Sequence, residues 1–137
     1  MGVPNVISVV LGTVLLGALF GPTLLCAIKG VKGMSAAELR RLRKGIERKN
    51  LLLLDVRSDG EFQGGHISGA RHLPLDRLKE GLPLLDALRE RNVVVVCASG
   101  RRSALAALRL KGAGFNNVYN LSGGMLAWGK EDVVRGK

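Results

Sequence analysis

The chain has 137 residues, enough for one ordinary domain and a short appendage but too few for two full domains. Its formal net charge is +10, but aromatic residues are only 4% of the sequence and no recognition helix can be identified, which argues against a nucleic-acid partner. Two cysteines, Cys26 and Cys97, and two histidines provide neither a disulfide framework nor a thiolate metal site, so we expect no metal and no cofactor.

The N-terminal segment is apolar. Residues 1–28 carry no charged side chain, and residues 3–28 are almost all Val, Leu, Ile, Gly, Ala and Phe. About 20 such residues cross a bilayer as a helix, whereas a cleaved signal peptide needs a basic start and a small-residue cleavage site that are absent here. We therefore predict one transmembrane helix over residues 1–29, in contact with the lipid bilayer. The spacing of Gly17 and Gly21 adds the hypothesis of a dimer through this helix.

A basic cluster follows this predicted helix. Residues 29–49 hold eight Lys or Arg against two Glu, and no basic residue precedes the apolar run. Because positive charge flanks the cytoplasmic end of a membrane helix, we expect a single-pass protein of the cell membrane whose domain faces the cytoplasm. Residues 30–50 then form a basic juxtamembrane segment that includes the first helix of the domain.

Helix and strand patterns alternate through the rest of the chain. Ser35 and Glu38 form a capping-box pattern, which predicts a helix to about residue 48 with Leu39, Leu42 and Ile46 on its buried face. Strands are predicted over 51–56, 93–96 and 117–121, and a further short strand is predicted to include residue 67 and residues 70–73. An amphipathic helix is predicted over 82–91 and another helix over 103–112. This order predicts an α/β fold with one parallel sheet and helices on both faces.

Cys97 is the most informative residue of the predicted sheet. It follows the strand over 93–96, and ligands of such sheets bind at the carboxyl ends of strands. The loop from Cys97 to Ser103 contains a glycine and two arginines and precedes a helix, a setting that lowers a thiol pKa. We therefore expect a reactive thiolate here rather than a structural cysteine.

The motifs of residues 34–132 keep a recognisable order. They are Asp55-Val56-Arg57, Glu61-Phe62, Gly65-His66-Ile67, Gly69-Ala70, Leu73-Pro74, the loop Cys97–Ser103, Leu121-Ser122-Gly123-Gly124 and Trp128. This pattern resembles the rhodanese family of sulfurtransferases, in its single-domain form. With the apolar N-terminus, the chain is similar to the membrane-anchored bacterial members, with a rhodanese domain over 34–132.

The resemblance implies sulfur transfer through a Cys97 persulfide, from a small sulfane-sulfur donor such as thiosulfate to cyanide, another thiol or a protein acceptor. Arg102 matches the arginine of the family's CxxGxR loop, whose planar fork suits an oxyanion. Arg101 occupies the variable position, where it either steers donors or is a solvated charge. The residues expected to hold the donor and the persulfide are Ala98, Ser99, Gly100, Arg101, Arg102 and Ser103.

Asp55, Arg57 and Glu61 are expected to support the loop. Asp55 and Arg57 would hold the surrounding segments through ion pairs, and the expected partner of Arg57 is Glu61. We interpret His66 as a structural hydrogen-bonding residue, because a thiolate needs no general base.

Two other functions are compatible with a reactive cysteine on such a sheet. Cysteine phosphatases place an arginine six positions after the nucleophile, where this chain has Ser103, so phosphatase and arsenate reductase chemistry is disfavoured. A membrane-tethered binding or redox-sensing module on the same fold stays open as the alternative function.

Overall fold

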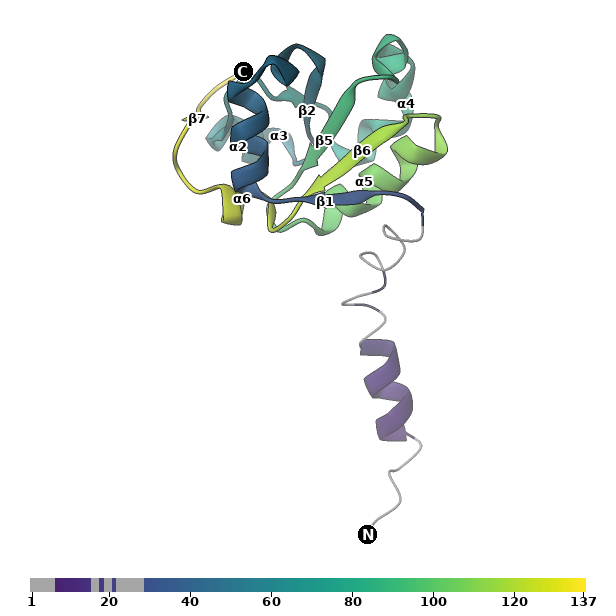
Figure 1. Ribbon diagram of the computed structural model, residues 1–137. Helices are drawn as coiled ribbons and strands as arrows, with labels where there is room; N and C mark the ends of the chain where they lie inside the picture. Colours follow the sequence, from purple (N-terminus) through teal and green to yellow (C-terminus); the bar gives the residue numbers. More distant parts are fainter. Residues whose placement is uncertain (1–6, 16–17, 19–20, 22–28) are drawn as a thin grey trace.

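The computed structural model describes residues 7–15, 18, 21 and 29–137 (Figure 1). Residues 7–15 are helical. The predicted transmembrane helix over residues 1–29, together with Gly17 of the pairing motif, lies largely outside the described residues. Within the described part of the chain, no helix has the length and apolar character needed to cross a membrane.

A five-stranded parallel sheet forms the centre of the domain (Figure 1). Its spatial order is β1-β6-β5-β2-β4. The strands are β1 (Lys32–Met34), β2 (Leu51–Asp55), β4 (Arg71–His72), β5 (Asn92–Val96) and β6 (Asn117–Leu121). The predicted parallel sheet is confirmed, with β5, which leads to Cys97, at its centre.

Two short strands form a separate antiparallel pair, β3 (His66–Ile67) with β7 (Val133–Val134). The sequence did not predict β1 or β7, because runs of three and two residues are too short to show a strand period. The predicted short strand spanning residue 67 and 70–73 is instead divided between β3 and β4. Gly69, at φ +79°, separates the two pieces.

Helices cover both faces of the sheet, as predicted (Figure 1). Alternate strand residues point to opposite faces, so Leu54 and Val95 belong to one core while Leu53 and Val94 belong to the other. The first core packs against α5 (Arg101–Gly112), and the second against α2 (Ala36–Lys44) and α6 (Gly124–Trp128). Each fully buried Leu or Val contributes about 1.5–3 kcal/mol, so the central strands fix where the loop after β5 emerges.

The first predicted helix is correct at its start and too long at its end. Ser35 Oγ accepts from the Glu38 N–H at 3.2 Å, and Glu38 accepts from the Ser35 N–H at 2.7 Å, the expected capping box. α2 ends at Lys44 because Gly45 is extended, and the chain continues as the 3-10 helix η1 (Ile46–Asn50). Ile46, expected on the buried face, is 95% exposed.

The remaining elements are short. They are α3 (Asp59–Gly64), the 3-10 helix η2 (Leu75–Arg77), α4 (Leu78–Gly81) and the 3-10 helix η3 (Leu82–Leu88). The predicted amphipathic α-helix over 82–91 was wrong in type and length. Within η3, Leu84 is exposed and Leu85 is buried.

Candidate active site

Cys97 lies between the end of β5 and the start of α5, at the carboxyl edge of the sheet, and its side chain is buried. Gly100 is the N-cap of α5 at φ +97°, a left-handed conformation that favours glycine and turns the chain back over the sulfur. The thiol therefore lies beside the N-terminus of a 12-residue helix. The helix dipole favours negative charge at this position.

Two hydrogen-bond donors reach the Cys97 sulfur. The Gly100 N–H lies 3.0 Å from Sγ, and the Ser103 hydroxyl oxygen lies 3.2 Å from it. Burial acts to raise the pKa of Cys97, but hydrogen bonds from the Ser103 side chain and from the N–H groups of Ser103, Gly100 and Ser99 outweigh it, so the pKa is lowered. The loop thus stabilises a thiolate.

Asn120, at the end of β6, is a site residue that the sequence analysis missed. Its Oδ1 lies 2.6 Å from Ser103 Oγ, and its Nδ2 donates to the Gly100 carbonyl at 3.0 Å. Since a hydroxyl has one proton, Ser103 donates either to Asn120 or to the sulfur, and the thiolate is the form that draws the proton toward Sγ. Asn120 is polar and lies near the carboxyl end of a predicted strand, where ligands of parallel sheets bind, and this position could have identified it from the sequence.

The start of α6 holds the loop from behind. The Met125 N–H donates to the Cys97 carbonyl at 2.9 Å, and the Leu126 N–H donates to the Ala98 carbonyl at 3.1 Å. Gly124, at φ +56°, lies so close that a Cβ there would be 2.3 Å from the Cys97 carbonyl oxygen. These contacts keep the carbonyls on the α6 side and leave the loop N–H groups to face the sulfur.

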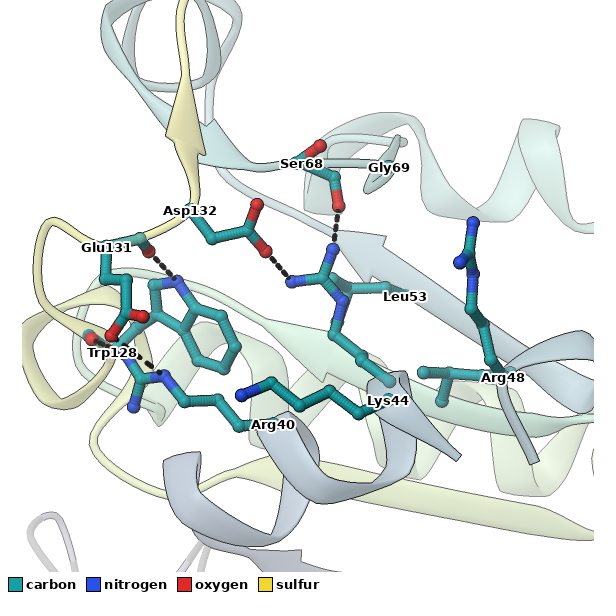
Figure 2. Close-up of a pocket in the computed structure, with 11 residues that line it drawn as sticks. Arg40, Lys44, Arg48, Leu53, Ser68, Gly69, Trp128, Glu131 and Asp132 are labelled. Carbon is teal, nitrogen blue, oxygen red and sulfur yellow. Dashed lines mark hydrogen bonds and ion pairs between the residues drawn. The ribbon is translucent and has the colours of Figure 1, made fainter. Parts of the chain in front are cut away.

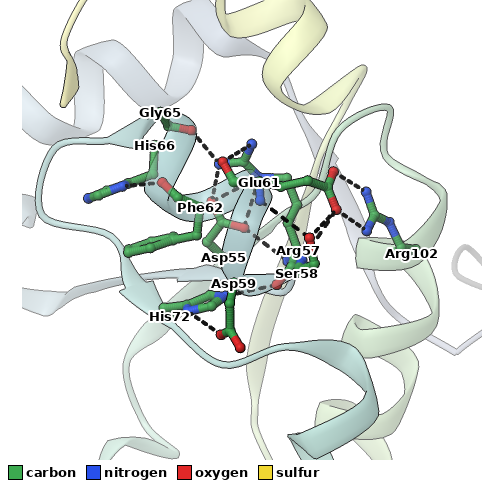
Figure 3. A network of polar contacts seen from close by, with 10 residues as sticks. All are labelled: Asp55, Arg57, Ser58, Asp59, Glu61, Phe62, Gly65, His66, His72 and Arg102. Carbon is green, nitrogen blue, oxygen red and sulfur yellow. Dashed lines mark hydrogen bonds and ion pairs between the residues drawn. The ribbon is translucent and has the colours of Figure 1, made fainter. Parts of the chain in front are cut away.

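Arg102 is not free to bind a donor. Its Nη1 and Nη2 donate to the two carboxylate oxygens of Glu61 at 2.7 and 2.8 Å (Figure 3). From its place in the CxxGxR loop this guanidinium was expected to face an oxyanion, but the Glu61 carboxylate occupies both of its nitrogens. The hydrogen bonds from Arg102, opposed by partial burial and helped by Ser58, lower the pKa of Glu61 to about 2.

Asp55, the last residue of β2, and Arg57 form a buried pair (Figure 3). Arg57 Nη2 donates to Asp55 Oδ2 at 2.8 Å and to the Gly65 carbonyl at 2.7 Å. The predicted ion pair between Arg57 and Glu61 is therefore wrong. Arg57 reaches only the Glu61 backbone carbonyl, at 3.4 Å, because Asp55 lies two residues away and is itself buried, whereas the Glu61 carboxylate turns outward to Arg102.

The sequence and the fold both match a known protein family. The Rhodanese-like domain model matches residues 38–131, well over half of the chain. This chain belongs to the rhodanese-like family. A crystal structure of a rhodanese-like domain protein from Staphylococcus aureus superimposes with a TM-score of 0.69 at 32% identity, covering 78% of this chain and 100% of that one.

Two sequence relatives of this rhodanese-like chain are longer than the matched region. An uncharacterized protein, YqhL, from Bacillus subtilis is 42% identical over 77 residues, 56% of this chain and 60% of that protein. The probable adenylyltransferase/sulfurtransferase MoeZ of Mycobacterium tuberculosis is 36% identical over 106 residues, 77% of this chain and 27% of that protein. The chain therefore spans less than two thirds of either relative.

The histidines of this rhodanese-like domain are held by backbone and ring contacts. His66 is buried, with Nδ1 2.7 Å from the Phe62 carbonyl, and His72 Nε2 lies 2.8 Å from the Arg57 carbonyl. The Phe62 ring stacks on both imidazoles, with centroids 3.6 and 4.2 Å apart. These contacts agree with a structural role for His66.

The remaining loop residues, Ala98, Ser99 and Arg101, make separate contacts. Arg101 is exposed, and its Nη2 donates to the Ala18 carbonyl at 3.2 Å. Ala98 contributes its carbonyl to α6, and Ser99 its N–H to the sulfur environment. Across the described residues, no three His, Cys, Asp or Glu side chains are grouped so that they could hold a metal ion.

A pocket of about 600 Å³ lies along α2, and none of its lining residues belongs to the Cys97 loop (Figure 2). Two of its cations are engaged internally: Arg40 lies 4.2 Å from the Trp128 ring centroid and donates to the Trp128 carbonyl, and Arg43 pairs with Asp132. These contacts join α2 to the end of α6 and to the segment that follows it. The pocket's remaining cations, Lys44 and Arg48, are exposed.

Proposed function

We propose that this chain is a sulfurtransferase that carries one sulfane sulfur atom on Cys97, from a donor such as thiosulfate to a thiophilic acceptor. The observation that carries the proposal is the buried thiol at the start of α5, with the Gly100 N–H and the Ser103 hydroxyl on its sulfur. Family membership and the sulfurtransferase in the name of MoeZ support it.

In the first half-reaction, the Cys97 thiolate attacks the outer sulfur of thiosulfate. The S–S bond of the donor breaks, sulfite leaves with the bonding electron pair, and Cys97 becomes a persulfide anion. Total charge is the same before and after, so the step needs neither a proton nor an oxidant. The loop N–H groups and the α5 dipole stabilise negative charge on either sulfur, which is the electrostatic assistance that the step requires.

In the second half-reaction, an acceptor thiolate or cyanide attacks the outer sulfur of the persulfide, and the Cys97 thiolate leaves. The only other cysteine of the sequence is Cys26, in the apolar N-terminal run. We therefore place the acceptor in another molecule.

The membrane location is a second part of the proposal. The uncharged residues 1–28 anchor the domain, and the basic cluster at 29–49 keeps it on the cytoplasmic side. The full chain would then remain in the membrane pellet after an alkaline carbonate wash. Release into the supernatant would contradict the anchor.

The test of the activity uses the full chain purified in detergent, with thiosulfate and cyanide. We expect thiocyanate from the wild type and none above background from Cys97→Ser. Ser122→Ala, which removes an exposed hydroxyl outside the loop, is the matched control and should turn over like the wild type. Equal thiocyanate from Cys97→Ser would contradict the proposal.

A further inference from the structure

We propose that Glu61 is a specificity-determining residue: by occupying Arg102, it disfavours doubly charged donors such as thiosulfate and favours alkyl persulfides. This inference rests on the proposed sulfurtransferase function and narrows its donor class. Glu61 thus takes part in the choice of donor. From the sequence it was expected only to form an ion pair with Arg57.

Glu61 holds the whole fork of Arg102. Each of the two guanidinium nitrogens that face outward donates to its own carboxylate oxygen, at 2.7 and 2.8 Å. Such bidentate, charge-assisted pairs are the strong form of an arginine–carboxylate contact, and a sulfonate group would have to replace both bonds at once.

Glu61 is also fixed beside the loop by its own helix. It is the third residue of α3, where its Oε1 accepts from the Ser58 hydroxyl at 3.0 Å and its own N–H donates to Ser58 Oγ at 3.3 Å. If a donor displaced Arg102, the capping box would still hold the ionised carboxylate next to the position of the donor. The negative charge therefore opposes an anionic donor whether or not the ion pair is open.

No second arginine of the network replaces Arg102. Arg57 is saturated by Asp55 and by the Gly65 carbonyl. Arg101 has no ion pair with a described residue, but it is exposed, where water and salt weaken its attraction. Arg109 lines the pocket next to Arg102, but it is exposed as well, and Asp76 in the same wall carries the opposite charge. A sulfonate would thus meet little net positive charge on its way to the thiolate.

The surface next to Arg102 offers apolar side chains on which an alkyl group can pack. A pocket of about 450 Å³ has Arg102 in its wall, together with the apolar side chains of Val56, Pro74 and Leu75 and the polar ones of Ser58, Asp76 and Arg109. The organic part of a persulfide can pack on these side chains, whereas sulfite has no apolar surface to bury.

The transfer from a persulfide balances in the same way as that from thiosulfate. The Cys97 thiolate attacks the outer sulfur of R–S–S⁻, the donor S–S bond breaks, and R–S⁻ leaves with the electron pair, so Cys97 becomes Cys97–S–S⁻. Two negative charges meet in this encounter, against three with thiosulfate. Because thiosulfate carries one more negative charge than an alkyl persulfide, the Glu61 carboxylate repels thiosulfate more strongly.

The experiment measures kcat/KM for two donors, thiosulfate and 2-hydroxyethyl persulfide, with the full chain and cyanide as acceptor. Glu61→Gln keeps the size of the side chain and removes its charge. Asp59→Asn is the matched control, because it removes a carboxylate from the same helix, but one that pairs with Arg77 instead of Arg102.

We expect Glu61→Gln to raise the thiosulfate-to-persulfide ratio of kcat/KM by about tenfold, mainly through a lower KM for thiosulfate, and Asp59→Asn to leave the ratio within about twofold. A merely structural role would move both donors together and leave the ratio unchanged, which would overturn the inference. Absence of turnover with either donor in the wild type would overturn the proposed function itself, and the inference with it.

Discussion

Two arginine–carboxylate pairs of one polar network differ chiefly in burial (Figure 3). The side chains of Arg57 and Asp55 are 7% and 1% exposed, and those of Arg102 and Glu61 are 40% and 36% exposed. The buried pair is saturated by protein groups and joins β2 to the segment around α3. The second pair lies at the surface beside the Cys97 loop. The same chemistry therefore holds the scaffold at one position and, at the other, occupies an arginine beside the catalytic loop.

The largest expected effect breaks the buried pair. Asp55→Asn leaves the Arg57 charge without its partner in the interior, and we expect a loss of about 3–5 kcal/mol in the free energy of unfolding. Arg102→Gln, at the exposed pair, should lower it by less than about 1 kcal/mol. Urea denaturation of both variants measures the contrast, and equal losses would remove the distinction between the two pairs.

The next effect concerns the contact that holds the loop. Gly124→Ala adds a Cβ 2.3 Å from the Cys97 carbonyl oxygen at a positive φ, so we expect a loss of about 1–3 kcal/mol and slower alkylation of Cys97. Gly69→Ala is the control, since Gly69 also has a positive φ, of +79°, but no atom within 4 Å of its Cβ position. Backbone strain is common to both variants, so only the excess in Gly124→Ala reports the clash. Identical behaviour would show that α6 does not position the loop.

A smaller effect is expected within the loop itself. Ser103→Ala removes the side-chain hydrogen bond that lowers the pKa of Cys97, while burial, which raises it, remains. The pKa should therefore rise, and the rate of iodoacetamide alkylation should reach its midpoint at higher pH than in the wild type. Ser122→Ala should leave the midpoint in place. A midpoint that stays or falls in Ser103→Ala would contradict the assigned role of the hydroxyl.

The smallest effect is the contribution of the exposed pair to stability as a function of pH. The pKa of Glu61 is lowered in the fold to about 2, so the pair stabilises the protein above the usual pKa of a glutamate and loses that effect as the pH falls toward 2. The difference in unfolding free energy between wild type and Glu61→Gln should be under about 1 kcal/mol and shrink over this window. A difference that grows on acidification would reverse the sign of the linkage.

The sequence predicted the scaffold better than the contacts of the site. Continuous apolar runs at 51–54 and 93–96 identified the buried central strands, and the capping box at Ser35 identified the start of α2. Cys97 and its loop followed from their position after β5. The 3-10 form of η3 was missed because the apolar spacing of that segment fits an α-helix equally well.

Partners across long sequence separations could not be read from local patterns. Arg102 and Glu61 are 41 positions apart, and their pairing depends on how α3 and α5 meet at the edge of the sheet. The Ser58-x-x-Glu61 spacing could have located the start of α3, but it gives no direction for the carboxylate. Asn120 likewise becomes a site residue only because β6 lies next to β5.

The central claim is that Cys97 accepts a sulfane sulfur atom. Intact-mass spectrometry of the full chain after incubation with a sulfane donor, with no acceptor present, tests it most directly. We predict that the wild type gains the mass of one sulfur atom, that the gain disappears on adding cyanide, and that Cys97→Ser shows no gain. An unmodified wild-type chain, or an equal gain in Cys97→Ser, would contradict the account.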